Sequence, residues 1–293
     1  MSLTGAQWAR IEPLLPDRTP RRGGRWRDHR QVIDAIAFKY RTGTPWTDLP
    51  EHFGSWKGAH NRLRMWAADG TWEKVFTALL AQADAEGDLD WVVAVDSTIV
   101  RAHQHAAGAR QKGPRTASAD HALGRSRGGL TTKIHLAADG RCRPLAFVIT
   151  PGQAGDAPAF TQVMHRLRVP RRIGRPRVTP DVVLADKAYS SRAIRQLLRQ
   201  RGIKTVIPQP SDQAANRKRL GRLGGRPPAF DRETYKQRNT VERSINKLKQ
   251  WRGLATRYDK TATSYLAGLH SQPSSSGQQG DPKETAGLVR PIM

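Results

Sequence analysis

Residues 230–251 read FDRETYKQRNTVERSINKLKQW, and the fold and the site of the whole chain are predicted starting from this stretch. It contains no glycine or proline, and Asp231 stands where a helix N-cap is expected. On one continuous helix, four chemically active side chains fall along one edge, within about 60° of one another. Three apolar side chains form an adjoining stripe that suits packing on a sheet. The four are Tyr235, Arg238, Glu242 and Lys249, and the apolar three are Val241, Ile245 and Leu248.

This edge has two interpretations. A charged helix face in contact with solvent explains it without any function. A carboxylate flanked by cations also fits a metal site that faces a phosphodiester. Glu242 can then bind a hard cation, while Arg238 and Lys249 hold backbone phosphates. The second interpretation requires further carboxylates elsewhere in the chain.

The charge of the chain points to a polyanionic partner. The formal net charge is +25 over 293 residues, and the pI is about 11.3. Residues 1–89 carry 13 Lys and Arg against 11 Asp and Glu, whereas residues 90–270 carry 35 against 12. The excess therefore belongs to the central and C-terminal part, which favours a nucleic-acid partner. A ribosomal or histone-like protein is the alternative for such a pI.

Other features of the sequence set the compartment. The single cysteine, Cys142, excludes an internal disulfide and a cysteine zinc cluster. No apolar run approaches the length of a membrane helix, and the N-terminus lacks a secretory signal pattern. We therefore expect a soluble, cytoplasmic protein.

The first 89 residues predict a small all-α domain. Helices are expected over 3–15, 28–43, a short segment near 44–53, 55–69 and 72–85, separated by proline and glycine. A short helix, a tight turn and a helix with exposed bases make up a helix-turn-helix arrangement, although a plain helical bundle is the alternative. The residues of the 55–69 helix that we expect to contact DNA are Asn61, Arg62 and Arg64.

Two strongly apolar runs each lead directly into an aspartate. Residues 91–95 precede Asp96, and residues 182–185 precede Asp186. A carboxylate that ends a buried strand is costly unless it is paired or binds metal, whereas the simpler interpretation is a cap of the next turn. His103 and His105 follow the first run, and we expect them to contact phosphate rather than metal.

The order of the remaining elements predicts the fold class. Residues 106–129 are rich in Gly, Arg and Ser and are expected to form a long loop, in which Arg125 and Arg127 would contact DNA; no nucleotide-binding loop is indicated. Strands are expected over 130–137, 145–150, 182–185 and 204–207, with a turn at Asp139-Gly140 and helices over 157–167 and 191–201. This order matches an α/β, ribonuclease H-like mixed sheet with flanking helices, preceded by the helix-turn-helix-type domain.

Three motifs together resemble those of the DDE transposases of bacterial insertion sequences, closest to the families numbered four and five. They are Asp96 in VDST, Asp186 in ADKAY and Glu242 in YKQRNTVERSINKLK. The resemblance covers roughly residues 1–270 and implies that the three acids form the catalytic triad. It implies two Mg²⁺ ions, with Mn²⁺ as a substitute, and no nucleotide. Tyr235, Arg238 and Lys249 would then contact DNA.

The resemblance also implies an activity. The chain would cut and join double-stranded DNA at the ends of an insertion element and at its target, as a homo-oligomer on DNA. Two alternatives are a metal nuclease that cuts without joining and a catalytically impaired remnant that only binds DNA. An intact set of three acids favours the enzymes.

The expected domains are a helical DNA-binding domain over 1–89, a catalytic domain over 90–270 and a polar, disordered tail over 271–293. Members of the family continue with an apolar closing helix, whereas this chain becomes rich in Ser, Gln, Gly and Pro after His270. A frameshift or a natural polar tail explains the change, and the frameshift puts activity in doubt. Without a closing helix, we expect Tyr265, Leu266 and Leu269 to pack incompletely and form an exposed patch.

Overall fold

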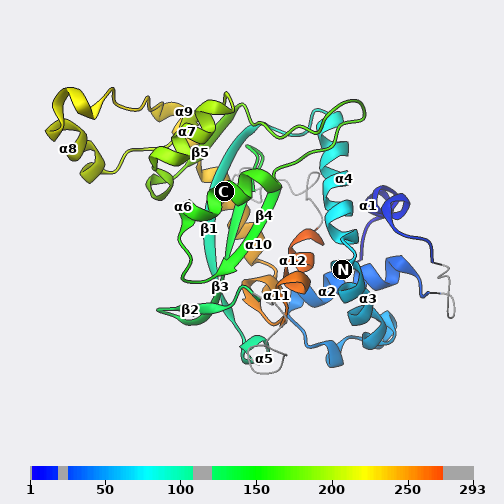
Figure 1. Cartoon of the computed structure of the whole chain (residues 1–293). Coiled ribbons are helices and arrows are strands. Elements are labelled where there is room, and N and C mark those ends of the chain that lie inside the picture. The colour runs from blue at the N-terminus through cyan, green and yellow to red at the C-terminus, as the bar shows by residue number, and fades with distance from the viewer. Residues whose placement is uncertain (1, 19–25, 108–120, 273–293) are drawn as a thin grey trace, which may run out of the picture.

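The computed structural model describes residues 2–18, 26–107 and 121–272. Its N-terminal part is entirely helical (Figure 1). The second helix illustrates why, because Asp28 accepts a hydrogen bond from the Gln31 N–H at its start and Gly43 ends it with φ 76°. The helical elements are α1 (Gly5–Ile11), η1 (Glu12–Leu14), α2 (His29–Thr42), η2 (Trp46–Asp48), η3 (Glu51–Phe53), α3 (Trp56–Ala68) and α4 (Thr71–Ala85).

A mixed sheet forms the centre of the rest of the chain, with five of its strands in the order β4-β3-β1-β5-β6. β1 is antiparallel to β3 and parallel to β5, which is in turn parallel to β6. This order and these directions are those of the ribonuclease H-like sheet that the sequence predicts. The strands are β1 (Val92–Ala102), β2 (Gly124–Ser126), β3 (Gly129–Ala138), β4 (Pro144–Pro151), β5 (Val182–Ala185), β6 (Lys204–Val206) and β7 (Thr256–Arg257).

Helices cover both faces of this sheet. The alternation of side chains along β1 sends Val93 and Val95 into one apolar cluster with α6 (Asp156–Arg166) and α7 (Arg192–Gln200). Ala94 joins a second cluster with α10 (Asn239–Lys249), α11 (Arg252–Ala255) and α12 (Ala262–His270) on the opposite face. The predicted apolar stripe is confirmed, because Val241, Ile245 and Leu248 are all buried there.

Two predicted elements differ from the structure. Residues 230–251 do not form one helix, because a turn at Gln237 and Arg238 separates α9 (Arg232–Lys236) from α10. Asp231 is nevertheless the predicted N-cap, since it accepts from the Thr234 N–H. The expected loop over 106–129 instead contains the short helix α5 (Gln104–Ala107) and β2, while residues 108–120 lie outside the described part.

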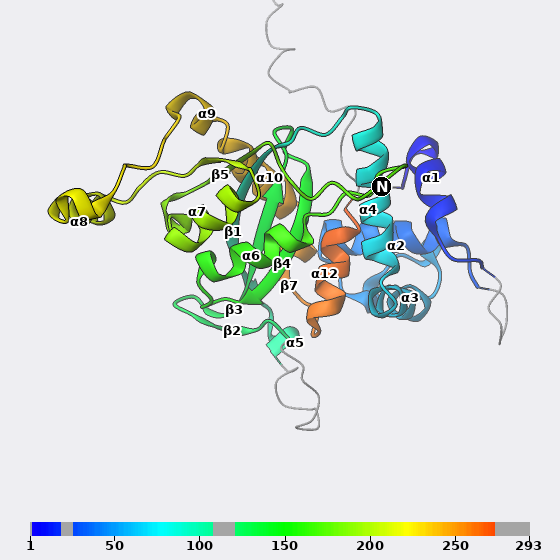
Figure 2. The same cartoon turned by 45° about the horizontal axis from the view of Figure 1, so that its top comes forward.

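A basic arm stands away from the sheet between β6 and α9 (Figures 1 and 2). It consists of α8 (Ser211–Arg219) and η6 (Gly221–Gly224), and neither element contains a buried residue. The sequence does not predict this arm, because a polar helix without an apolar stripe has no periodic signal.

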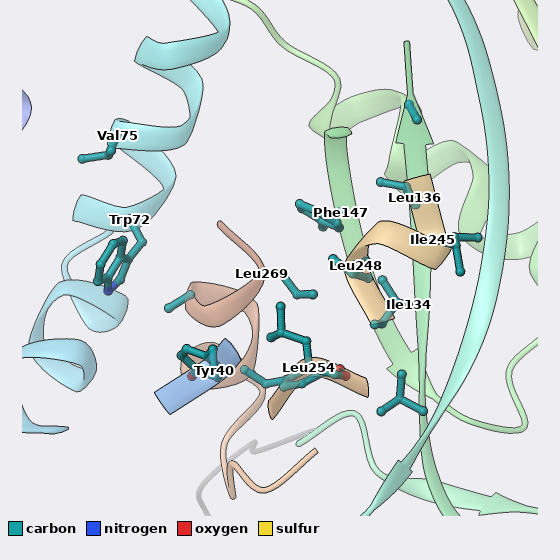
Figure 3. Close-up of a cluster of buried hydrophobic side chains, with 14 of the residues drawn as sticks. Tyr40, Trp72, Val75, Ile134, Leu136, Phe147, Ile245, Leu248, Leu254 and Leu269 are labelled. Atoms are coloured by element: carbon teal, nitrogen blue, oxygen red, sulfur yellow. Dashed lines mark hydrogen bonds between the residues drawn. The ribbon is translucent and has the colours of Figure 1, made fainter. Parts of the chain in front are cut away.

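The N-terminal helices and the sheet share one apolar core. Tyr40 of α2 and Trp72 of α4 belong to the same buried cluster as Ile134 and Leu136 of β3. Figure 3 shows Leu254 and Leu269 among these side chains, between the N-terminal helices and the strands. The cluster crosses the expected boundary at residue 89, so the two parts are packed together as one body.

This packing corrects the expectation of an exposed patch on α12. Tyr265 and Leu269 are 0% and 1% exposed, and Leu266 is partly buried against the same core. The reason is that α12 packs against α3, α4 and β4, so the N-terminal helices provide its apolar cover. The polar tail expected over 271–293 lies, apart from residues 271 and 272, outside the described residues.

We expect the free energy of unfolding to fall as the pH is lowered from 7 to 5. Burial lowers the pKa of His135 and of His270 from 6.5 to about 4. The unfolded chain therefore takes up protons near pH 6.5, whereas the folded chain does so only near pH 4. At about 1.4 kcal/mol per unit, each histidine contributes at most roughly 3 kcal/mol, present in full above pH 6.5.

Urea unfolding across this pH range measures the effect. The His270→Gln variant should lose part of this pH dependence. Equal pH dependence in the wild-type protein and His270→Gln would contradict the assignment.

Candidate catalytic site

The two predicted aspartates lie on neighbouring strands. β1 and β5 run parallel with Val95 opposite Ala185, and Asp96 and Asp186 are the next residues on each. Parallel strands in register bring these two positions to the same place at the edge of their pairing. The predicted adjacency of Asp96 and Asp186 therefore follows from the strand register.

Asp96 does not end its strand, contrary to the sequence prediction. β1 continues to Ala102, because the residues after Asp96 keep pairing with β3 on the other side. Only the pairing with β5 stops, since β5 ends at Ala185 and Asp186 caps the turn η5 (Lys187–Tyr189) by accepting from the Ala188 N–H at 2.9 Å. Among the described residues, the β5-facing side of β1 thus has no strand partner from Asp96 until Arg101, where β7 pairs with it.

The surroundings of Asp96 act on its charge in both directions. Burial raises the pKa of its carboxyl, and the neighbouring Asp186 raises it further. The Ser97 N–H, at 2.7 Å from Oδ1, and the Arg238 guanidinium act against this rise. A partly buried carboxylate beside a second one is stable only with cations close by.

Arg238 supplies such a cation, and it also brings Glu242 to the site. Its Nη1 donates to Asp96 Oδ2 at 2.9 Å, and its Nη2 donates to Glu242 Oε1. The Tyr235 ring lies beside it, with its centroid 6.0 Å from the Arg238 Cζ. The sequence predicts a phosphate contact for Arg238, but the structure places it between two carboxylates. Tyr235, Arg238, Glu242, Asp96 and Asp186 therefore come together.

The chemistry of this group fits a divalent metal ion. In the described ranges 2–18, 26–107 and 121–272, no three His, Cys, Asp or Glu side chains are arranged closely enough to hold one. However, a single guanidinium separates Asp96 from Glu242, so a cation already bridges two of the three carboxylates. Carboxylate oxygens are the ligands that Mg²⁺ prefers. The donor set fits such an ion once Arg238 releases the acids.

Other predicted DNA contacts lie outside this group. Lys249 is the exposed last residue of α10, two turns beyond Glu242. Arg125 and Arg127 are exposed on the hairpin formed by β2 and β3. His103 packs edge-on against His105, with their ring centroids 4.6 Å apart.

One of the three DNA contacts predicted on α3 is buried in the structure. Asn61 and Arg64 are exposed on α3, but Arg62 is only 9% exposed. Its guanidinium lies 3.9 Å from the centre of the Trp26 ring, and its Nη1 is 3.1 Å from His29 Nδ1. Arg62 is buried because it points inward from α3 and is held by aromatic rings rather than by solvent. Sequence cannot separate it from Arg64, since both are basic residues of one helix.

Sequence reasoning missed a polar cluster on the opposite face of β1. Asp156, the first residue of α6, accepts from Ser97 Oγ at 2.7 Å and from Lys133 Nζ at 3.0 Å. Its Oδ1 also lies 3.8 Å from Nδ1 of the fully buried His135. Asp156 follows Gly155 at a helix start, so the sequence suggests only a capping residue there.

Comparison with known families identifies the class of protein that this fold and site define. Residues 87–267 match the model described as "Transposase DDE domain", and residues 3–76 match "Putative transposase of IS4/5 family". The chain therefore belongs to the DDE transposase family of bacterial insertion sequences, a family of enzymes. Domains of this family in general depend on divalent metal ions.

Individual relatives agree with this assignment. The chain is 41% identical over 105 residues to an uncharacterized protein, y4sN, of Sinorhizobium fredii, covering 36% of this chain and 80% of the relative. It is 39% identical over 102 residues to an uncharacterized 16.2 kDa protein of insertion element IS402 from Burkholderia cepacia (32% and 69%). It is 29% identical over 146 residues to a putative transposase for insertion element IS6501 from Brucella ovis (48% and 93%).

Solved structures also align with the chain. The catalytic domain of Mos1 mariner transposase aligns at 13% identity with a TM-score of 0.25, over 66% of this chain and 90% of that one. The Mos1 strand transfer complex aligns at 16% identity with a TM-score of 0.26, over 81% and 80%. Within the described part of this chain, helices are too short or too polar to cross a membrane.

Proposed function

We propose that this chain cuts DNA at the ends of an insertion element and joins those ends to a target. Asp96, Asp186 and Glu242 are the catalytic residues. The observation that carries the proposal is that one guanidinium, that of Arg238, holds both Asp96 and Glu242, while the register of β1 and β5 places Asp186 beside Asp96.

The three carboxylates would hold Mg²⁺, with Mn²⁺ as a substitute. Bound there, the metal supplies a lowered pKa for the attacking water or 3′-hydroxyl and stabilises charge on the leaving oxygen. Asp96 and Asp186 contribute ligands from a rigid sheet, so their spacing is fixed by backbone pairing. Glu242 is 47% exposed and projects from a helix, so its side chain can adjust when Arg238 leaves.

Arg238 has two partners in this proposal. Before DNA and metal arrive, it neutralises Asp96 and Glu242 across the site. With those carboxylates serving as metal ligands, the Arg238 guanidinium would be free to hold a phosphate of the bound strand by bidentate hydrogen bonds. The exposed Lys249, Arg125 and Arg127 extend the basic surface, which attracts DNA by charge.

An assay of this activity uses the purified protein and a DNA duplex that carries one end of the element. We expect cleavage with Mg²⁺ or Mn²⁺, none in excess chelator, and no requirement for ATP. Joined products with a second, circular DNA distinguish a transposase from a nuclease that only cuts. Full cleavage in chelator would remove the metal mechanism.

We expect Arg238→Ala to lower the cleavage rate by about 30-fold or more and to weaken DNA binding several-fold, because a charge-assisted phosphate contact is lost. The concentration of Mg²⁺ at half-maximal rate should fall, since no internal cation then competes for Asp96 and Glu242. Arg232→Ala, on the preceding helix, is the matched control. Wild-type rate and Mg²⁺ requirement in Arg238→Ala would show the bridge to be a surface ion pair without a role.

We expect Arg62 and Arg64 to differ although they lie on one helix. Arg62→Ala should cost roughly 2 kcal/mol of stability, because it removes stacking on Trp26 and the contact with His29 Nδ1. Arg64→Ala and Asn61→Ala should leave stability within about 0.5 kcal/mol and weaken binding to the element end. Thermal unfolding and gel-shift titration of the three variants measure this. Reversed effects would mean that α3 presents a different face to DNA.

A further inference from the structure

The polar cluster around Asp156, which includes Ser97, Lys133 and His135, lies on the face of β1 opposite the candidate catalytic site. Ser97 follows Asp96 on β1, and neighbouring residues of a strand point to opposite faces of the sheet. Asp96 therefore faces Arg238 on the α10 side, while Ser97 faces Asp156 on the α6 side. Any movement of Ser97 moves the backbone that carries Asp96.

Three hydrogen bonds hold Asp156 and its surroundings in place. Asp156 Oδ1 accepts from Ser97 Oγ at 2.7 Å and from Lys133 Nζ at 3.0 Å, and Lys133 Nζ also donates to the Ala154 carbonyl at 2.7 Å. The Lys133 side chain is only 12% exposed and that of Asp156 is 26% exposed. A charged pair so far removed from solvent keeps one geometry better than a surface ion pair does.

The same cluster reaches the second catalytic strand through Tyr189. Tyr189 ends the turn that Asp186 begins and is 1% exposed. Its ring packs against that of Phe160 of α6, with the two ring centroids 5.8 Å apart. Burial raises the pKa of its hydroxyl, and the charges of Asp156, Asp96 and Asp186 raise it further. The start of α6 thus contacts the segments that carry both aspartates.

We propose that Asp156 is a positioning residue for the Asp96–Asp186 pair, acting through its hydrogen bond to Ser97; this rests on the function proposed above. Asp156 fixes the β1 backbone at Asp96 against α6, and α6 holds the Asp186 turn through Tyr189. In metal sites of this kind, the ligands can be displaced by only well below ~1 Å before activity falls. A backbone anchor beside a ligand therefore affects the rate of the chemical step.

Asp156→Ala tests the anchor and Asp156→Asn keeps it, because the amide oxygen still accepts from Ser97. With pre-bound DNA at saturating protein, we expect Asp156→Ala to cleave about 20-fold or more slowly, with DNA affinity within twofold. Asp156→Asn should recover to within about fivefold of wild type. Asp181→Ala, which removes an exposed acid just before β5, should match wild type.

Ser97→Ala completes the cycle. It should lose as much rate as Asp156→Ala, and the double variant should lose no more than either single one, since both remove one hydrogen bond. Rate losses that multiply in the double variant would overturn the proposal. An Asp156→Asn variant that cleaves as slowly as Asp156→Ala would also overturn it. So would an Asp156→Ala rate within twofold of wild type.

Amide hydrogen exchange decides the question independently of cleavage. Asp156→Ala should speed exchange in peptides covering residues 94–100 and 184–191, and leave residues 239–249 unchanged. Unchanged exchange in the first two peptides would overturn the anchor. A wild-type protein that never cleaves would defeat the proposed function instead, while the exchange result would still decide the role of Asp156.

Discussion

Asp96→Ala, Asp186→Ala and Glu242→Ala should each reduce cleavage of an element end by about 1000-fold or more. Each variant removes a carboxylate from one site, and the remaining two cannot hold a divalent ion in the same geometry. DNA binding should remain within a few-fold of wild type, because binding depends on the surrounding cations. The cleavage rate in a single-turnover assay, normalised to bound DNA, separates an effect on cleavage from an effect on DNA binding.

Matched controls come from acids outside the site. Glu233→Ala removes an exposed glutamate of α9 that pairs with Lys236. Asp181→Ala removes an exposed aspartate that pairs with Arg177. Both should cleave at the wild-type rate, since exposed ion pairs contribute little. Cleavage within tenfold of wild type in any of the three site variants would contradict the triad.

Tyr40→Ala should lower the free energy of unfolding by about 3–5 kcal/mol. Its side chain is fully buried, and its hydroxyl lies 3.2 Å from Asp259 Oδ2 and from the Ser264 carbonyl. Its ring also packs on the glycines of α11 and α12. A Cβ placed on Gly268 would lie 2.4 Å from the Tyr40 Cζ, so Gly268→Val should be destabilising to a similar degree.

The position of the loss tests whether the chain is one body. Hydrogen exchange should show lost protection in α2, α12 and β3 together, because Tyr40 joins the N-terminal helices to the core of the sheet. Phe230→Ala, at a side chain 44% exposed, is the control. Loss confined to residues 26–85 would show instead that the N-terminal helices fold independently, as the sequence suggests.

The sequence predicts best where a local signal fixes an element. Asp28 and Gly43 mark the ends of α2, and the apolar run 182–185 is β5 with Asp186 directly after it. Strand order follows from the sequence of elements, and the two aspartates were expected side by side. The register that pairs Val95 with Ala185 is a long-range property and is visible only in the structure.

What the sequence could not predict depends on contacts between distant residues. Arg62 looks like a DNA contact until the rings of Trp26 and Trp66 are seen around it. Tyr265 and Leu269 appear to lack cover because the helices that bury them lie near the other end of the chain. Asp156 appears to be a helix cap, since its partners Ser97 and Lys133 come from strands far from it in sequence.

Cleavage of the protein backbone by bound Fe²⁺ tests most directly whether Asp96, Asp186 and Glu242 together hold divalent metal. Fe²⁺ in the presence of ascorbate and peroxide generates radicals that cut the chain next to the ion. We predict cuts near residues 96, 186 and 242 together, all suppressed by excess Mg²⁺ and all lost in Asp96→Ala. Cuts that spare the Glu242 segment, or that persist in Asp96→Ala, would contradict the account.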